Sequence, residues 1–168
     1  MARGLPSFEV SASFTRPADT TQYASGDLVA NNTTAGSVTL LSWDFGTLGA
    51  GDGIWLRRLL ATKSDPDITG ASFRLWLHND SAVTFSNGDN GALAIASSTL
   101  PIANVSKGQP IDFDFDFTLT GAGDVGVATW DTGLIWLPPV VYGFLEARGT
   151  YTPGNAEVFT IYLRGDPY

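Results

Sequence analysis

The chain has 168 residues, of which 43% are hydrophobic and 15% charged, so it is long enough for one domain with a single large core. Its formal charge of −8, from 17 acidic and 9 basic residues, argues against a nucleic-acid-binding surface. The absence of cysteine excludes disulfides, thiolate metal sites and cysteine nucleophiles. The 19 glycines and 9 prolines indicate a turn-rich β architecture.

The domain organisation follows from where regular patterns begin and end. We expect an N-terminal arm at 1–6, one β domain at 7–165 and a C-terminal tail at 166–168. The arm lacks the apolar stretch of an export signal, so we expect synthesis in the cytoplasm. The apolar run at 134–141 is short and contains two prolines, so no membrane insertion is expected.

The first half of the chain contains four predicted strands. Alternation of apolar and polar residues predicts a strand at 7–15, and polar turns separate the three that follow it. These strands lie at 27–30, 38–43 and 54–61. Arg57 and Arg58 interrupt the alternation in the last one, which indicates a bulge or a short helix there; we predict strand.

The segment 71–78 sorts its side chains most clearly in this region. Phe73, Leu75 and Leu77 occupy one face, whereas Arg74, Trp76 and His78 share the opposite face. The following residues, 82–110, show no clear period, and we assign no structure to them.

The run from Ile111 to Phe117 alternates aromatic residues with aspartates, a pattern that only an extended strand can sort by face. We expect the phenylalanines to face a core and the aspartates to face water. A turn at 121–124 then predicts a hairpin with a strand at 125–130. The remaining predicted strands are 134–137, 142–150 and 157–164, with a turn at 153–155 between the last two.

Nine or ten such strands without intervening helices predict an all-β fold, an antiparallel β-sandwich. Their number favours a jelly roll over a seven-stranded immunoglobulin-like arrangement.

Asp112, Asp114 and Asp116 invite comparison with a calcium site. Alternate residues on one strand face lie roughly 6.5–7 Å apart, too far for all three to close around one ion at about 2.3–2.6 Å. We favour a solvated face paired with arginines such as Arg74, Arg148 or Arg164. A face that contacts a basic partner is the alternative. No metal or cofactor is expected.

Catalytic chemistry has little support in the sequence. His78 is the single histidine, no Gly-x-Ser-x-Gly elbow accompanies it, and we expect it on the surface. Glu146 and Glu157 flank a turn and could approach each other as a glycosidase pair, but outward-facing strand carboxylates are the favoured interpretation. We expect no enzyme and assign no catalytic residue.

Trp76 on the polar face of its strand suggests a subunit or partner contact, with sugar binding as the rival explanation. The predicted contact set is Arg74, Trp76, His78, Asp112, Asp114 and Asp116. A sugar-stacking platform would draw on a wider set of aromatic residues, most of which we expect in the core. That set is Trp55, Trp76, Trp130, Trp136, Tyr142 and Tyr151.

The segment from Phe14 to Val29, FTRPADTTQYASGDLV, resembles one near the start of small virion proteins of tailed bacteriophages and prophages. The resemblance covers chiefly residues 8–30. It implies a capsid decoration, or cement, protein, several of which are jelly rolls that attach to an assembled head as dimers or trimers.

This resemblance implies a virion location, the major capsid protein as partner, and arms that become ordered only on the particle. A tail or baseplate component would share these features. The principal alternative function is a carbohydrate-binding module of a phage tail or fibre, which an exposed Trp76 in a concave site would favour.

Overall fold

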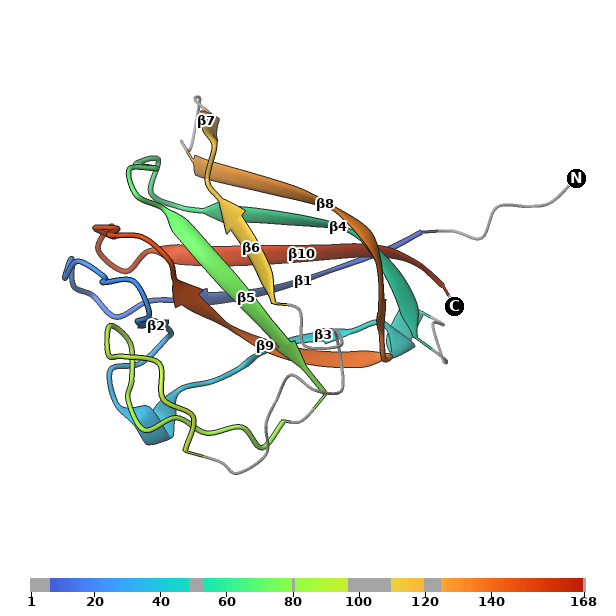
Figure 1. The fold of residues 1–168 in the computed structure, drawn as a ribbon, viewed down its shortest axis with the longest axis horizontal. Coiled ribbons are helices and arrows are strands. Elements are labelled where there is room, and N and C mark those ends of the chain that lie inside the picture. The colour runs from blue at the N-terminus through green and yellow to red at the C-terminus, as the bar shows by residue number, and fades with distance from the viewer. Residues whose placement is uncertain (1–6, 49–52, 80, 97–109, 120–124, 168) are drawn as a thin grey trace, which may run out of the picture.

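The computed structural model describes residues 7–48, 53–79, 81–96, 110–119 and 125–167. Over these residues the protein is nearly all β and forms two antiparallel sheets that pack face to face (Figure 1). The predicted all-β sandwich is confirmed, and the jelly-roll arrangement stays a prediction.

Sheet 1 contains five strands, each antiparallel to its neighbours. In spatial order they are β1 (Phe8–Thr15), β10 (Val158–Pro167), β4 (Ile54–Lys63), β8 (Val125–Leu137) and β7 (Phe117–Leu119). The strands predicted at 125–130 and 134–137 are therefore one continuous strand. The register shifts between Leu56 and Arg58, so the irregularity at Arg57 is the expected bulge rather than a helix.

Sheet 2 has its four central strands in the order β2 (Leu28–Val29), β9 (Val140–Ala147), β5 (Ser72–His78) and β6 (Ile111–Asp114). A fifth strand, β3 (Leu41–Asp44), pairs with the first half of β9. Two short 3-10 turns, η1 (Ala35–Ser37) and η2 (Gly46–Leu48), flank β3.

The alternating aromatic and acidic run does not form one strand. Its first part, β6, pairs with β5 in sheet 2, and its last part, β7, pairs with β8 in sheet 1. Phe113 and Phe115 are buried as expected, but Phe117 is 43% exposed on the outer face of sheet 1. The expectation that all its phenylalanines face the core is therefore wrong for Phe117, because the chain crosses between sheets after Phe115.

The main core lies between the sheets and is rich in aromatic rings. Phe73 contacts Phe113, Phe115, Tyr151 and Phe159, at centroid separations of 5.4–6.1 Å. This packing gives a cysteine-free fold an extensive buried apolar surface.

A second, smaller core covers part of the outer face of sheet 2. Val83 and Phe85, from the segment 81–96, pack with Phe144 and Leu28 of the sheet. This segment had no predicted structure, and it contains only isolated bridges, Asp27 with Ala92 and Phe85 with Ile95. Apolar contact with the sheet holds it in place.

The predicted ends of the domain are only partly described. Asp166 and Pro167, expected in a C-terminal tail, extend β10 and pair with Trp55 and Ile54 of β4. The expected arm at 1–6, the tail residue Tyr168 and the turn at 121–124 lie outside the described residues.

Candidate functional site

Part of the predicted contact set forms a charged row on the outer face of sheet 2. Asp112, Arg74 and Glu146 are register partners on β6, β5 and β9. Arg74 donates from Nε and Nη2 to the two carboxylate oxygens of Asp112, at 2.6 and 2.8 Å. These hydrogen bonds lower the pKa of Asp112 and raise that of Arg74. The predicted pairing of the acidic face with Arg74 is confirmed for Asp112.

Trp76 lies beside this row and is fixed by it. Its Nε1 donates to Glu146 Oε2 at 2.7 Å, and the Arg74 guanidinium lies 5.4 Å from the ring centroid. Arg148 donates to the other oxygen of Glu146 at 2.8 Å, and the ring of Phe144 stacks on Trp76. The indole is half-buried among these groups, so it is not the exposed sugar platform that the rival interpretation required.

The remaining members of the predicted set are dispersed. His78 is fully buried, with its ring stacked near Tyr142 and close to Phe144, so the expectation of a surface histidine is wrong. Phe144 also packs against Phe85 of the segment 81–96, whose cover of this sheet face the sequence did not reveal. Asp114 is exposed opposite Ser72, whereas Asp116 lies beyond β6, where its N–H bonds to the carbonyl of Val127 in sheet 1.

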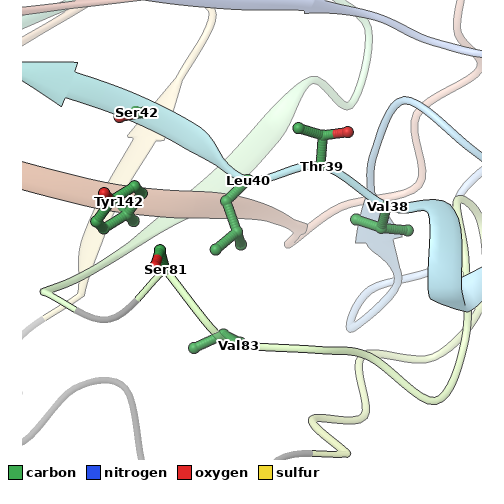
Figure 2. A pocket seen from close by; sticks show the side chains of 7 residues that line it. All are labelled: Val38, Thr39, Leu40, Ser42, Ser81, Val83 and Tyr142. Atoms are coloured by element: carbon green, nitrogen blue, oxygen red, sulfur yellow. The ribbon is translucent and has the colours of Figure 1, made fainter.

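A groove of about 360 Å³ opens beside the covering segment (Figure 2). Leu40 and Val83 point into it, with Tyr142 and Ser81 at one end and Val38 at the other. Thr39 and Ser42 complete the lining. The described lining is aliphatic and hydroxylated and includes no carboxylate or imidazole, so it suits binding better than acid–base chemistry.

The sequence did not reveal a buried network around Asp89. Arg16 Nη2 lies 2.7 Å from Asp89 Oδ2, and both side chains are fully buried. The Tyr23 hydroxyl and the Ala30 N–H donate to Asp89 Oδ1 at 2.6 and 2.7 Å, and Arg16 Nε donates to the Tyr23 hydroxyl. Burial raises the pKa of both Asp89 and Tyr23.

A second buried network surrounds Lys63 at the end of β4. Its Nζ lies 3.2 Å from Glu157 Oε1 and 2.8 Å from the hydroxyl of Tyr151, and it also donates to the carbonyls of Asp65 and Asp67. The Tyr151 hydroxyl donates to Glu157 at 2.7 Å. Burial raises the pKa of Glu157 and lowers that of Lys63.

Glu157 is therefore buried, and the prediction of an outward-facing carboxylate there is wrong. Glu146 is largely buried too, in its separate network with Trp76 and Arg148, so each glutamate has its own cationic partner. A sequence signal for the Lys63 site did exist. Leu59, Ala61 and Lys63 alternate on β4, which places the lysine on the inward face.

The outer face of sheet 1 carries exposed apolar side chains at both ends of its strands. Near the end of β4, Phe117, Leu119 and Val158 are 43%, 55% and 36% exposed, and we call this group the apolar end. Near the start of β4, Trp55 and the 37%-exposed Trp136 are register partners, and we call this pair the tryptophan end. Neither surface belonged to the predicted contact set.

Within the described ranges, no cluster of three or more histidine, cysteine or acidic side chains is arranged to hold a metal. No helix in the same ranges has the length and apolar character needed to cross a bilayer.

Comparison with known proteins gives matches of low similarity. No family model matches the chain. It is 27% identical over 122 residues to a protein of Penicillium oxalicum named endo-1,4-beta-xylanase B. That match covers 67% of this chain, and the chain spans only 38% of the fungal protein. A Mud Crab Dicistrovirus structure aligns with 95% of this chain and 67% of the viral one, at 12% identity and a TM-score of 0.24.

Proposed function

We propose that this protein is a structural component of a phage virion that binds and stabilises the assembled capsid, with no catalytic role. The apolar end of sheet 1 is the observation that carries the proposal. Phe117, Leu119 and Val158 present large apolar side chains to solvent on one sheet face, the type of surface that proteins use for partner contacts. The resemblance of residues 14–29 to phage virion proteins supports the same role.

The charged row on sheet 2 is a weaker candidate for the capsid contact than the apolar end. Arg74 and Asp112 satisfy each other through two hydrogen bonds, and Glu146 is bonded by Trp76 and Arg148. A partner would have to disrupt these bonds to engage the same groups, which costs free energy. We therefore propose the apolar end as the surface that contacts the major capsid protein, with the protein attaching as a dimer or trimer.

A binding role, rather than a catalytic one, is supported by the partners of the most deeply buried carboxylates. Asp89 and Glu157 are each committed to a buried cation and a tyrosine hydroxyl, which gives them a structural function.

Cosedimentation with undecorated phage heads tests the proposal. We expect saturable binding at a fixed number of copies per head, and a large loss of binding in the double variant Phe117→Ser/Leu119→Ser. The matched control, Arg74→Ala/Asp112→Ala, alters the exposed ion pair on the other sheet and should bind as the wild type does. Absence of wild-type binding would refute the capsid role, whereas loss only in the control variant would move the contact to sheet 2.

We propose carbohydrate binding as a second candidate function, supported by the tryptophan end. Trp136 is 37% exposed beside Trp55, and exposed aromatic rings are suited to stacking against sugar rings. The name of the fungal relative, an endo-1,4-beta-xylanase, is a further point in favour of a sugar ligand.

A further inference from the structure

The tryptophan end contains an acidic and a basic side chain beside its two indoles. Asp166, Trp55 and Trp136 form one register row across β10, β4 and β8, and therefore share a face. Arg57, at the bulge of β4, donates from Nε to Asp166 Oδ2 at 2.7 Å. The side chains of this ion pair are 53% and 38% exposed, so both remain accessible to a ligand.

Gly53 shapes the position of Trp136. Its φ of 110° is a backbone conformation that residues with a side chain rarely adopt, and a Cβ there would lie 2.3 Å from the carbonyl oxygen of Leu137 and 3.2 Å from Trp136 Nε1. The indole nitrogen of Trp136 therefore lies close to the glycine that precedes β4. The residue as a whole is 37% exposed to solvent.

We propose that the tryptophan end is a binding site for a neutral, linear, β-linked oligosaccharide. This inference rests on the second candidate function and assigns its site and ligand class. A pyranose ring stacks on Trp136, and its hydroxyl groups exchange hydrogen bonds with the Arg57–Asp166 pair. The aromatic ring supplies apolar contact, and the ion pair supplies donors and acceptors that fix orientation.

Charge and shape select this ligand class. Arg57 and Asp166 neutralise each other, so the pair offers no net attraction to an acidic sugar and favours a neutral one. The row crosses three neighbouring strands, which lie about 4.8 Å apart. An extended chain of sugar rings can follow such a face, whereas a helically coiled polysaccharide would curve away from it.

Isothermal titration calorimetry with xylohexaose and cellohexaose tests the site. We expect the wild type to bind at least one of them, and Trp136→Ala to lower the affinity by about tenfold or more. Trp136→Phe, which retains an aromatic face, should recover most of the binding. The matched control is Phe117→Ala, which removes a similarly exposed ring from the opposite end of the same sheet and should bind sugar as the wild type does.

The outcomes separate this inference from both proposed functions. If the wild type binds sugar and Trp136→Ala binds it equally well, the proposed site is wrong, but the proposed carbohydrate-binding function stands. Failure of the wild type to bind either sugar would overturn both the proposed site and the proposed carbohydrate-binding function. A wild-type dimer that Trp136→Ala converts to monomer in sedimentation velocity, without sugar binding, would show a self-association surface and overturn the sugar site. Capsid cosedimentation is independent, and Trp136→Ala should retain it.

Discussion

Arg16 and Asp89 form a fully buried ion pair, with Nη2 and Oδ2 2.7 Å apart, although 73 residues separate them in the chain. The pair joins the end of β1 to the segment 81–96, and Tyr23 and the N–H of Ala30 complete the bonding of the carboxylate. Arg16 and Tyr23 both belong to the segment that resembles phage virion proteins. At these two positions the resemblance therefore involves residues that the fold itself requires.

Removal of the Asp89 side chain should lower the free energy of unfolding substantially. Asp89→Ala leaves the buried Arg16 guanidinium with only the longer contact of 3.4 Å to the Asp19 carboxylate, so we expect a loss of about 3–5 kcal/mol in the free energy of unfolding. Urea denaturation measures it. Asp112→Ala is the matched control, because its partner Arg74 is near the surface, and it should cost only about 0–1 kcal/mol. Equal losses in the two variants would contradict the structural role of the buried pair.

Glu157 should make stability depend on pH in a defined direction. Burial raises its pKa above the ordinary value of 4.5, so the folded chain holds this proton at pH values where the unfolded chain has lost it. Between these two pKa values the free energy of unfolding falls as pH rises. Glu157→Gln lacks this titration. We expect it to be the less stable protein, with a deficit relative to wild type that shrinks as pH rises from 4.

Urea denaturation of both proteins between pH 4 and about pH 7 measures this difference, at about 1.4 kcal/mol for each unit of pKa shift. Lys63 titrates in both proteins, and because its pKa is lowered from 10.5, its loss of a proton adds stability as pH rises toward 10.5. A deficit that widens from pH 4 upward would mean that the Glu157 pKa is lowered, contrary to the structure.

Alternation predicted the faces of the strands well, because burial on one side imposes a period of two. It placed Phe73 and Leu75 in the core and Arg74 and Trp76 on the opposite face of β5, as observed. It could not reveal which sheet a strand joins, so the passage of the chain from β6 to β7 was missed. The alternation of apolar and polar residues is the same whether or not the chain crosses from one sheet to the other.

The functional surfaces were harder to predict because they depend on segments distant in sequence. Nothing near His78 in the sequence indicates that it will be buried, and Asp89 lies in an irregular stretch without a period. The tryptophan end requires the register of β4 with β8, which brings Trp55 opposite Trp136, a residue 81 positions further along the chain. Single-sequence patterns do not determine such pairing.

Trp43 should stabilise the contact between the two sheets. Its indole Nε1, on β3 of sheet 2, donates to the carbonyl of Ile161 on β10 of sheet 1 at 3.0 Å, and the side chain is fully buried. Trp43→Phe removes this donor and leaves unfilled volume, so we expect a loss of about 1–3 kcal/mol. Trp136→Phe, at an exposed position, should change stability by less than about 0.5 kcal/mol. Thermal or urea unfolding that ranked the two variants in the opposite order would contradict this role.

Gly143 should tolerate no side chain, because β9 lies close to the backbone of Trp76 and to the indole of Trp43 there. A Cβ would lie 2.6 Å from the carbonyl oxygen of Trp76 and 3.1 Å from Cζ3 of Trp43, and neither a ladder carbonyl nor a fully buried indole can move freely. We expect Gly143→Ala to lower the free energy of unfolding by about 1–3 kcal/mol, the usual cost of overpacking. Gly36→Ala is the control, since a Cβ there meets nothing within 4 Å. If urea denaturation gave both variants wild-type stability, the close packing of β9 against the Trp76 carbonyl and the Trp43 indole would be wrong.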